Sequence, residues 1–437
     1  MQDTQSNALV IGYGASGASV RRYLERRGWR VSVTDRDPAR AQFAGVAWCA
    51  PETVGAALAD AALVVVSPGV PLASDLVADA RERGIEIVGD IELFARAAAA
   101  PVVAVTGTNG KSTVATLVAA MAAADGRRVA AGGNLGTPAL DLLAAEVELY
   151  VLELSSFQLE LTTSLAPAAA AVLNLSPDHL DRHGSLGAYA AAKARIYEHA
   201  ALAVANRDDA LVMKMVHGRD AVVSFGLDAP QDGDYGLRER NGELLLCRGE
   251  ETLLVANEVP LAGRHNLANV LAAWALGAAL GLSDAAMAKA VRGFHALPHR
   301  LAPVGEHRGV CYLDDSKATN VSAACAALAG LEGPLVVIAG GQGKGQDFAE
   351  FAELLSARAR AVVLIGADAG LIERAIDGRV PVVRAAGMSD AVGMAAALAE
   401  TGDQVVLAPA CASLDMFRDY NERGDIFTRA VEALDGD

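Results

Sequence analysis

Short apolar runs rich in Val, Ile and Leu alternate along this chain with longer, Ala- and Leu-rich amphipathic stretches. Such runs are typical of buried strands in a parallel sheet, and the stretches between them are typical of the helices that cover the sheet. A more polar segment around Asn241-Gly242 predicts a β-hairpin. The pattern therefore predicts an α/β fold along the whole chain.

The predicted strands fall into three sets. The first set comprises Leu9–Ile11, Val31–Val33, Leu63–Val66 and Ile85–Val88. The second set comprises Val102–Val105, Leu149–Leu152, Ala171–Leu173 and Leu202–Val204. The third set comprises Cys311–Leu313, Leu335–Ile338, Val362–Ile365, Val380–Val383 and Val405–Leu407.

The length of the chain also favours three domains, because 437 residues correspond to about three units of ~150 residues. We expect a Rossmann-like domain over residues 1–92, a central domain like a P-loop ATPase over 93–298, and a second Rossmann-like domain over 299–437.

The amino-acid composition argues against some classes of binding partner. The net charge is −16, from 37 basic and 53 acidic residues, which argues against gripping nucleic acid or anionic lipid with the whole surface. Anionic substrates remain possible in local basic pockets. The polar N-terminus and the lack of a long apolar run lead us to expect a cytoplasmic protein with no membrane insertion.

The five cysteines lie far apart without a Cys-x-x-Cys pair, so we expect buried, reduced thiols rather than a zinc site or disulfides. They are Cys49, Cys247, Cys311, Cys325 and Cys411.

A first glycine-rich loop, Gly12-Tyr-Gly14-Ala-Ser-Gly17, follows the strand Leu9–Ile11, and Asp35 ends the next strand. This is the spacing of a dinucleotide-binding fingerprint, which alone favours an NAD-dependent oxidoreductase. A tight turn without any ligand is the structural alternative. More generally, glycines let a diphosphate approach the N–H groups of a helix N-terminus, and we interpret the loop as a site for a nucleoside diphosphate.

A second loop, Thr106-Gly-Thr-Asn-Gly-Lys-Ser-Thr113, has the chemistry of a phosphate loop. Backbone N–H groups would surround the phosphates, Lys111 would neutralise them, and the Ser112 hydroxyl could reach Mg²⁺. The loop is a shortened variant, since Val105 stands where the strict pattern has glycine. An enzyme that transfers a hydride has no use for a triphosphate loop.

Other candidate groups follow predicted strands in the second set. Glu153 could hold Mg²⁺ beside the phosphate loop, or be an ordinary surface carboxylate. His179 and His183 have helical spacing, but without a His-Glu-x-x-His pattern a zinc site is not favoured. His179 remains a candidate magnesium ligand. Lys193, within an Ala-rich helix, has the pattern of a surface cation.

Three segments of the third domain also lie at strand ends, where open α/β sheets bind ligands. They are Asp314–Asn320, Gly340–Gly345 and Pro409–Phe417. The first two bring Lys317 and Lys344 to such ends, as recognition of a small anion requires. Turn chemistry explains any one of them alone. Asn266, at the start of an Ala- and Leu-rich helix, could contact a nucleotide or cap the helix.

The order of these motifs resembles the Mur ligases, and most closely the branch that adds D-glutamate to UDP-N-acetylmuramoyl-L-alanine. The resemblance covers essentially the whole chain. The motifs that carry it are Gly107–Thr113, Glu153–Gln158, Asp178-His179, Tyr189–Lys193, Gly263–Asn266, His299-Arg300, Asp314–Asn320 and Ser413–Phe417.

The resemblance assigns a role to each site residue. ATP would be bound by Gly107, Thr108, Asn109, Gly110, Lys111, Ser112 and Thr113, with Asn266, Arg300 and Asp315 across domains. Two Mg²⁺ sites would use Ser112, Glu153, His179 and a carbamylated Lys193. The UDP-substrate would contact Gly14, Ala15, Ser16, Asp35, Arg36, Gly69, Asn134, Ser155 and Gln158. D-Glutamate would contact Thr319, Lys344, Ser413 and Tyr420, and catalysis would use Lys111, His179, Lys193 and Lys317.

The implied activity is that of an ATP-dependent acid–amino-acid ligase acting through an acyl phosphate. It would serve peptidoglycan precursor synthesis in the cytoplasm, and so cell-wall biogenesis, cell shape and division, and we expect a monomer. One departure from the family pattern is Tyr420, which stands where phenylalanine is familiar.

Three alternatives stay open. One is another amide ligase of the superfamily, which adds a diamino acid or extends a polyglutamate tail on folate. The others are an NAD-dependent oxidoreductase and a non-catalytic nucleotide-binding scaffold.

Overall fold

The computed structural model describes residues 6–37, 39–40, 45–134 and 136–436. The chain divides into two compact units, each of which is described by itself. The first unit comprises Met1–Leu175, Gly187–Leu254 and Asn269–Val291, and the second comprises Ser176–Leu186, Val255–Ala268 and Arg292–Asp437.

The first unit begins with a five-stranded parallel sheet in the order β3-β2-β1-β4-β5. Its strands are β1 (Asn7–Ile11), β2 (Arg30–Thr34), β3 (Ala47–Trp48), β4 (Leu63–Val66) and β5 (Glu86–Val88). Its helices are α1 (Ala15–Glu25), α2 (Val54–Ala59), α3 (Asp75–Glu82) and α4 (Asp90–Ala95). Leu9 and Val10 are both fully buried and belong to separate apolar clusters. Because successive strand residues point to opposite faces, this sheet is covered on both sides, as a Rossmann-like domain requires.

A nine-stranded sheet follows, in the order β14-β13-β12-β11-β10-β9-β6-β8-β7. Its strands are β6 (Val102–Thr106), β7 (Val129–Gly133), β8 (Leu149–Glu153), β9 (Ala169–Val172), β10 (Ala203–Asn206), β11 (Val222–Phe225), β12 (Tyr235–Arg240), β13 (Glu243–Arg248) and β14 (Glu251–Val255). Its longer helices are α5 (Lys111–Ala124), α8 (Leu186–Ala194), α10 (Arg264–Ala279) and α11 (Asp284–Arg292). Shorter helical segments are α6 (Ser156–Leu159), α9 (Ala210–Met215), η2 (Ala139–Leu142) and η3 (Arg195–Tyr197), whereas η4 (Ala256–Glu258) belongs to the second unit.

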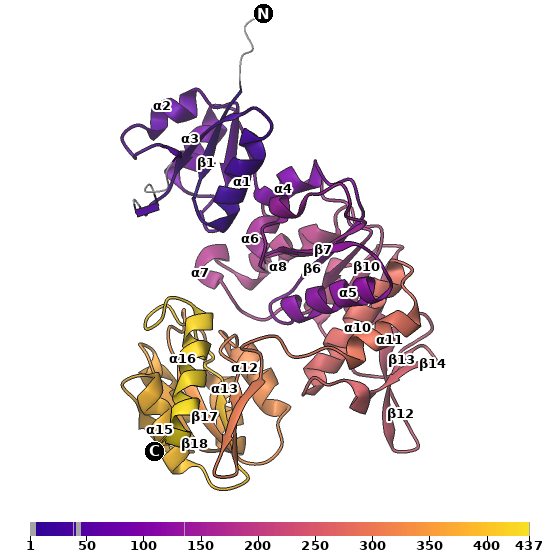
Figure 1. The fold of residues 1–437 in the computed structure, drawn as a ribbon, viewed down its shortest axis with the longest axis vertical. Helices are drawn as coiled ribbons and strands as arrows, with labels where there is room; N and C mark the ends of the chain where they lie inside the picture. Colours follow the sequence, from indigo (N-terminus) through magenta and orange to yellow (C-terminus); the bar gives the residue numbers. More distant parts are fainter. Residues whose placement is uncertain (1–5, 38, 41–44, 135, 437) are drawn as a thin grey trace, which may run out of the picture. The chain divides into compact units, whose positions relative to one another are not determined.

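The predicted hairpin is confirmed between β12 and β13, which pair antiparallel (Figure 1). Asn241 and Gly242 both have positive φ angles, of 54° and 79°. Positive φ at both central positions is the requirement of a tight two-residue turn of this kind.

The third sheet lies in the second unit and has the order β15-β16-β20-β17-β18-β19. Its strands are β15 (Ala302–His307), β16 (Val310–Asp314), β17 (Leu335–Gly340), β18 (Ala359–Ile365), β19 (Val382–Arg384) and β20 (Gln404–Leu407). Its helices are α7 (Leu180–His183), α12 (Val321–Ala329), α13 (Ala349–Arg358), α14 (Ala369–Ile376), α15 (Met388–Leu398), α16 (Tyr420–Glu432) and η5 (Ala433–Gly436). One face packs against α12, α13 and α14, and the other against α15 and α16 (Figure 1). The expected α/β fold with three sheets is confirmed.

The expectation that the cysteine thiols are buried is confirmed for only some of the five cysteines. Cys247, Cys325 and Cys411 are buried, but Cys49 and Cys311 are partly exposed, so for these two the expectation was wrong. Among the described residues, no helix is both long and apolar enough to cross a membrane.

Glu92, on α4, is a buried carboxylate that connects α4 to the loop after α6 through hydrogen bonds. Its Oε2 accepts hydrogen bonds from the N–H groups of Thr163 (2.7 Å) and Ser164 (2.9 Å), and its Oε1 accepts one from Arg96 (3.0 Å). Although burial acts to raise it, the pKa of Glu92 is lowered to about 2, chiefly by these backbone donors. The ionised form is therefore the one that stabilises this contact.

We expect Glu92→Gln to destabilise the contact by about 1–3 kcal/mol at pH 7, because a charged acceptor is lost. The folded pKa is depressed, so the wild-type advantage is present above the ordinary carboxyl pKa of 4.5 and is lost as pH falls towards 2. Amide hydrogen exchange at Thr163 and Ser164 measures the change. Glu86→Gln is the control, since Glu86 pairs with Arg96 on an exposed surface. Equal exchange in both variants would contradict the assignment.

Candidate active site

The loop between β6 and α5, which resembles a phosphate-binding loop, requires glycine at two positions. Gly107 has φ +154° and Gly110 has φ +82°. A Cβ added at Gly110 would lie 2.5 Å from Asn269 Oδ1, and one at Gly107 would lie 3.0 Å from Leu173 Cβ. The loop therefore packs against its neighbours with its backbone and leads directly into α5, whose N-terminus carries the positive end of the helix dipole, which suits an anion.

Asn174 fixes the shape of this loop, and the sequence analysis missed it. Its Oδ1 accepts from the N–H of Asn109 (2.8 Å), and its Nδ2 donates to the Asn109 carbonyl (3.1 Å). The carbonyl of Asn174 also accepts from the N–H of Thr108 (3.0 Å). The available signal was a polar residue directly after the predicted strand Ala171–Leu173.

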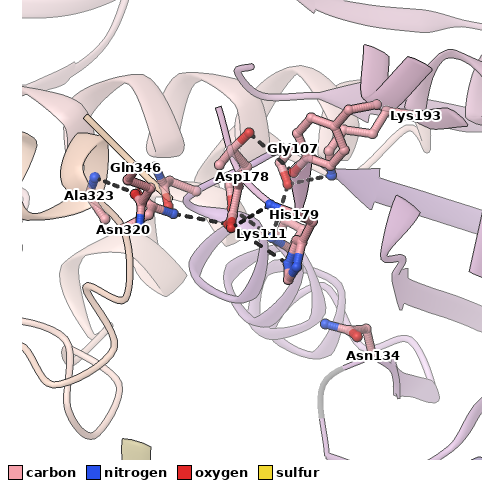
Figure 2. Close-up of polar contacts among 12 residues, drawn as sticks. Gly107, Lys111, Asn134, Asp178, His179, Lys193, Asn320, Ala323 and Gln346 are labelled. Carbon is pink, nitrogen blue, oxygen red and sulfur yellow. Dashed lines mark hydrogen bonds and ion pairs between the residues drawn. The ribbon is translucent and has the colours of Figure 1, made fainter. Parts of the chain in front are cut away.

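Two lysines donate to one carbonyl oxygen of the loop (Figure 2). Lys111 Nζ lies 2.9 Å from the Gly107 oxygen and 2.8 Å from the Thr108 oxygen. Lys193 Nζ lies 2.8 Å from the same Gly107 oxygen and 3.2 Å from Thr106 Oγ1. The surface position that the helical pattern suggested for Lys193 is wrong, because the residue is 1% exposed.

Tyr189, one turn earlier on α8, packs against the same lysine. Lys193 Nζ lies 4.6 Å from the centre of the Tyr189 ring. The Tyr189 hydroxyl is 3.3 Å from Thr108 Oγ1, so Tyr189 contacts both the lysine and the loop.

Glu153 ends β8 at the same sheet edge, because β6 and β8 pair in parallel with Val105 opposite Glu153. The residue is 3% exposed, and its Oε1 accepts a hydrogen bond from Asn134 Nδ2 at 2.7 Å. Ser112, on the first turn of α5, is 4% exposed. A carboxylate and a hydroxyl are the hard oxygen donors that Mg²⁺ prefers.

Ser155 and Gln158 follow Glu153 and form a capping box on α6. Ser155 Oγ accepts from the Gln158 N–H (3.2 Å), and Gln158 Oε1 accepts from the Ser155 N–H (3.1 Å). Gln158 Nε2 donates to Asp90 Oδ2 at 3.2 Å. Burial raises the pKa of Asp90, which is 2% exposed. The sequence analysis did not single out Asp90, although it lies just after the predicted strand Ile85–Val88.

Asp35 fixes the conformation of the first glycine-rich loop by hydrogen bonding. Its Oδ2 accepts from the N–H of Tyr13 (2.6 Å) and from Arg40 (3.1 Å). Burial acts to raise the pKa of Asp35, but the backbone donors of Asp37 and Tyr13 and the charge of Arg40 lower it overall. Gly17 is required here, since a Cβ would lie 2.1 Å from the Gly12 oxygen. This loop contains the candidates Gly14, Ala15 and Ser16. Arg36 lies in the segment after β2, and Gly69 lies in the segment after β4.

In the second unit, the loop after β16 is organised by two buried charged residues. Asp315 accepts from the N–H of Leu301 (3.1 Å), and burial raises its pKa to about 8. Arg423 is fully buried, and burial lowers its pKa to about 10. Its guanidinium donates to Ser316 Oγ (2.9 Å), the Ser316 carbonyl (2.7 Å) and the Cys411 carbonyl (3.0 Å). The sequence analysis missed Arg423, whose partners are mostly backbone atoms distant in sequence.

The second unit also contains the candidates for amino-acid recognition. They are Lys317 and Thr319 after β16, Lys344 after β17, Ser413 after β20 and Tyr420 at the start of α16. Lys344 is exposed and Ser413 is buried. His179, Asn266 and Arg300 belong to this unit as well. Within it, Asn320 Nδ2 donates to Asp178 Oδ2 at 3.2 Å, beside His179 (Figure 2).

The fold and these loops define a nucleotide-binding α/β protein, and the comparisons with known proteins identify its family. Residues 6–89 match the model described as Mur ligase MurD-like, N-terminal domain. Residues 105–277 match the Mur ligase middle domain, and residues 299–411 match the Mur ligase, glutamate ligase domain. The chain belongs to the Mur ligase family.

Relatives and solved structures agree with this assignment. The chain is 48% identical to a UDP-N-acetylmuramoylalanine–D-glutamate ligase from Nitrosococcus oceani, covering 98% of this chain and 97% of the relative. It is 49% identical to the enzyme of the same name from Pseudomonas aeruginosa, covering 98% of each. In fold it is similar to a pseudomurein peptide ligase type C from Methanothermus fervidus (TM-score 0.66, 18% identity, covering 98% of this chain and 100% of that one). A UDP-N-acetylmuramate-alanine ligase from Thermotoga maritima has a TM-score of 0.64, with 19% identity and coverage of 98% and 99%.

We expect Gly110→Ala to weaken nucleotide binding at least about tenfold, because the new Cβ both strains the left-handed backbone and collides with Asn269. Gly126→Ala is the matched control. Gly126 has φ +85°, but nothing lies within 4 Å of an added Cβ, so this variant has the strain without the collision. Calorimetric titration with ATP compares the two, and unchanged affinity in Gly110→Ala would contradict the role of the loop.

Proposed function

We propose that this protein is an ATP-dependent ligase that adds D-glutamate to UDP-N-acetylmuramoyl-L-alanine in peptidoglycan precursor synthesis. The observation that carries the proposal is the loop whose Gly107 carbonyl is shared by Lys111 and Lys193, beside the buried carboxylate of Glu153. Its support from relatives is the 48–49% identity, over nearly the whole chain, to enzymes named for that reaction.

The loop fits the phosphates of ATP because its glycines leave the backbone uncovered and its helix begins at Lys111. When bound, ATP would phosphorylate the L-alanyl carboxylate, and the amine of D-glutamate would displace phosphate from the acyl phosphate to form the amide. Lys111 would offset negative charge on the phosphoryl oxygens in transfer. Asn266, Arg300 and Asp315 would contact the nucleotide from the second unit.

Magnesium fits the oxygen donors Ser112 and Glu153, and it would reduce the repulsion between phosphates and substrate carboxylate. The described residues hold no cluster of three or more His, Cys, Asp or Glu side chains that could bind a metal ion. By the resemblance to the Mur ligases, further ligands would come from Lys193 as a carbamate and, for a second ion, from His179.

Carbamylation of Lys193 is favoured by its surroundings. Two ammonium groups within hydrogen-bond distance of one carbonyl repel each other, and the one on Lys193 is almost completely shielded from water. The Lys193 ammonium group would first release one proton. The neutral nitrogen would then form a bond to the carbon of CO₂ while an electron pair moves to an oxygen, and it would release a second proton. The product carries one negative charge, so repulsion from Lys111 becomes attraction.

The substrates would bind at the glycine-lined strand ends. The loop held by Asp35 would take the uridine diphosphate end, and Asn134, Ser155 and Gln158 would face the muramoyl group. Lys317, Thr319, Lys344, Ser413 and Tyr420 would surround D-glutamate. We also propose that the enzyme acts as a monomer in the cytoplasm.

Phosphate release from ATP with UDP-N-acetylmuramoyl-L-alanine tests the proposed reaction. We expect release with D-glutamate and none with L-glutamate, L-lysine or diaminopimelate. Release with a diamino acid would favour another ligase of the family, and no release with any amino acid would overturn the proposal.

We expect Lys193→Ala to lower turnover at least about 100-fold, because an electrostatic group at the reacting phosphates is lost. Acetate should restore part of the activity by supplying a small carboxylate. Lys289→Ala, which removes an exposed lysine from helix α11, is the control and should be fully active with or without acetate. Full activity of Lys193→Ala without acetate would refute the carbamate.

A further inference from the structure

Asp90 is a buried carboxyl group to which neither the sequence analysis nor the proposed reaction assigns a role. It begins α4, directly after the first sheet, and is 2% exposed. Its Oδ2 accepts a hydrogen bond from Gln158 Nε2 at 3.2 Å, whereas its Oδ1 is buried without a partner among the described residues. Since buried polar groups are usually hydrogen-bonded, this carboxyl calls for an explanation.

The side-chain amide of Gln158 is fixed at both of its ends. Its Nε2 donates to Asp90, and its Oε1 accepts from the Ser155 N–H at 3.1 Å and from Ser155 Oγ at 3.2 Å. A flipped amide would place its NH₂ group against the Ser155 N–H, which is also a donor, and its oxygen against Asp90 Oδ2. The two contacts together therefore hold the amide in one orientation, with its oxygen towards Ser155.

This orientation determines which hydrogen bond the Ser155 hydroxyl can make. Its hydrogen is donated to Gln158 Oε1, and one of its lone pairs accepts from the Gln158 backbone N–H at 3.2 Å. A hydroxyl has one hydrogen and two lone pairs, so within the described part of the chain a single lone pair is left. Ser155 is partly exposed, whereas Gln158 is 3% exposed. A ligand therefore meets an acceptor at Ser155, not a donor.

The protonated form of Asp90 suits this arrangement. Burial raises its pKa, although hydrogen bonds from Gln158 and the Ile91 N–H act to lower it. Because Oδ2 faces a donor, the proton belongs on Oδ1. A neutral acceptor thus holds the amide without placing an unpaired charge inside the protein.

The position of Ser155 indicates which donor it meets. It lies two residues after Glu153, the magnesium candidate that ends β8. In the substrate of the proposed function, magnesium belongs beside the L-alanyl carboxylate that is phosphorylated. The alanyl amide N–H is the donor nearest to that carboxylate, since one carbon atom separates the two groups.

We propose that Asp90 is a positioning residue that, through the Gln158 amide, keeps Ser155 as a hydrogen-bond acceptor for the alanyl N–H of the UDP-linked substrate. The inference rests on the proposed function for the identity of that substrate. It assigns a role to a buried residue that acts through its neighbours, and it assigns a direction to the hydrogen bond at Ser155.

Two variants separate the acceptor at position 90 from a carboxylate charge. Asp90→Asn keeps a neutral acceptor, and we expect its KM for UDP-N-acetylmuramoyl-L-alanine to stay within about twofold of wild type. Asp90→Leu leaves the Gln158 amide free to turn, and we expect that KM to rise about three- to tenfold, with KM for ATP unchanged. An Asp90→Asn variant as impaired as Asp90→Leu would overturn the proposal.

A double-mutant cycle shows whether Asp90 acts through Ser155. Ser155→Ala removes the acceptor, so we expect Asp90→Leu to raise the KM of Ser155→Ala by less than about twofold. Thr162→Val is the control, because it removes a buried hydrogen bond to the Gln158 carbonyl without touching the amide, and it should leave KM unchanged. If Asp90→Leu does not fold, Gln158→Met takes its place in the cycle. Effects that simply multiply would overturn the proposal.

A substrate analogue tests the direction of the hydrogen bond. UDP-N-acetylmuramoyl-L-lactate has an ester oxygen in place of the alanyl N–H, so it offers no donor at that position. In calorimetric titrations we expect wild type to bind this analogue at least about fivefold more weakly than the amide, and Ser155→Ala to bind both equally. Equal binding of both compounds by wild type would overturn the proposal.

A readout without substrate keeps this inference separate from the proposed function. The side-chain NH₂ group of Gln158 gives NMR signals, which Gln158→Met assigns. We expect slow hydrogen exchange at this group in wild type and in Asp90→Asn, and fast exchange in Asp90→Leu. If no amino acid supports phosphate release, the proposed function fails while this exchange still tests the contact, and fast exchange in wild type overturns it.

Discussion

The carbonyl oxygen of Gly107 is the point on which the central site depends. It accepts hydrogen bonds from both Lys111 and Lys193, and it belongs to a loop that glycine alone can form. Without an anion, the buried ammonium group of Lys193 and the partly buried one of Lys111 bring two positive charges close together, which is unfavourable. The loop is held in spite of this by neutral partners, above all by Asn174, which binds both backbone groups of Asn109. The phosphates and the carbamate of the proposed function would relieve this repulsion.

Glycines that allow close backbone contacts occur at the carboxyl ends of strands in all three sheets. A Cβ at Gly17 would lie 2.1 Å from the Gly12 oxygen, and one at Gly341 would lie 2.3 Å from the Ala412 oxygen. Each glycine lets two backbone segments touch and leaves the strand end open to a ligand. A chain with net charge −16 can thereby bind anionic substrates, since the positive groups that matter are local and its overall field has the opposite sign.

The sequence predicted the main strands because β-branched runs are buried on both faces of a parallel sheet. It missed β7 (Val129–Gly133), whose residues after Val129 are alanine and glycine, and it missed the two-residue β3. It also suggested a surface position for Lys193, because an Ala-rich helix such as α8 gives no contrast between its buried and exposed faces. The only sequence signal for Asn174 was its place directly after a predicted strand. Arg423 gave no such signal, since its partners are mainly backbone atoms that only the folded chain brings near.

Asp315 illustrates how a buried carboxyl group at a proposed site can cost stability. Burial raises its folded pKa to about 8, whereas its ordinary value is 3.8. A raised carboxyl pKa means that the folded state binds the proton more tightly than the unfolded chain, so this group favours folding most at low pH and progressively less as pH rises from about 4 to 8. An apolar residue in its place would avoid that penalty near neutral pH. The charge of Arg300 acts to lower the pKa, as does that of Arg423. With a pKa of about 8 the carboxyl is mainly protonated at neutral pH, so it can donate a hydrogen bond to a partner as well as accept one.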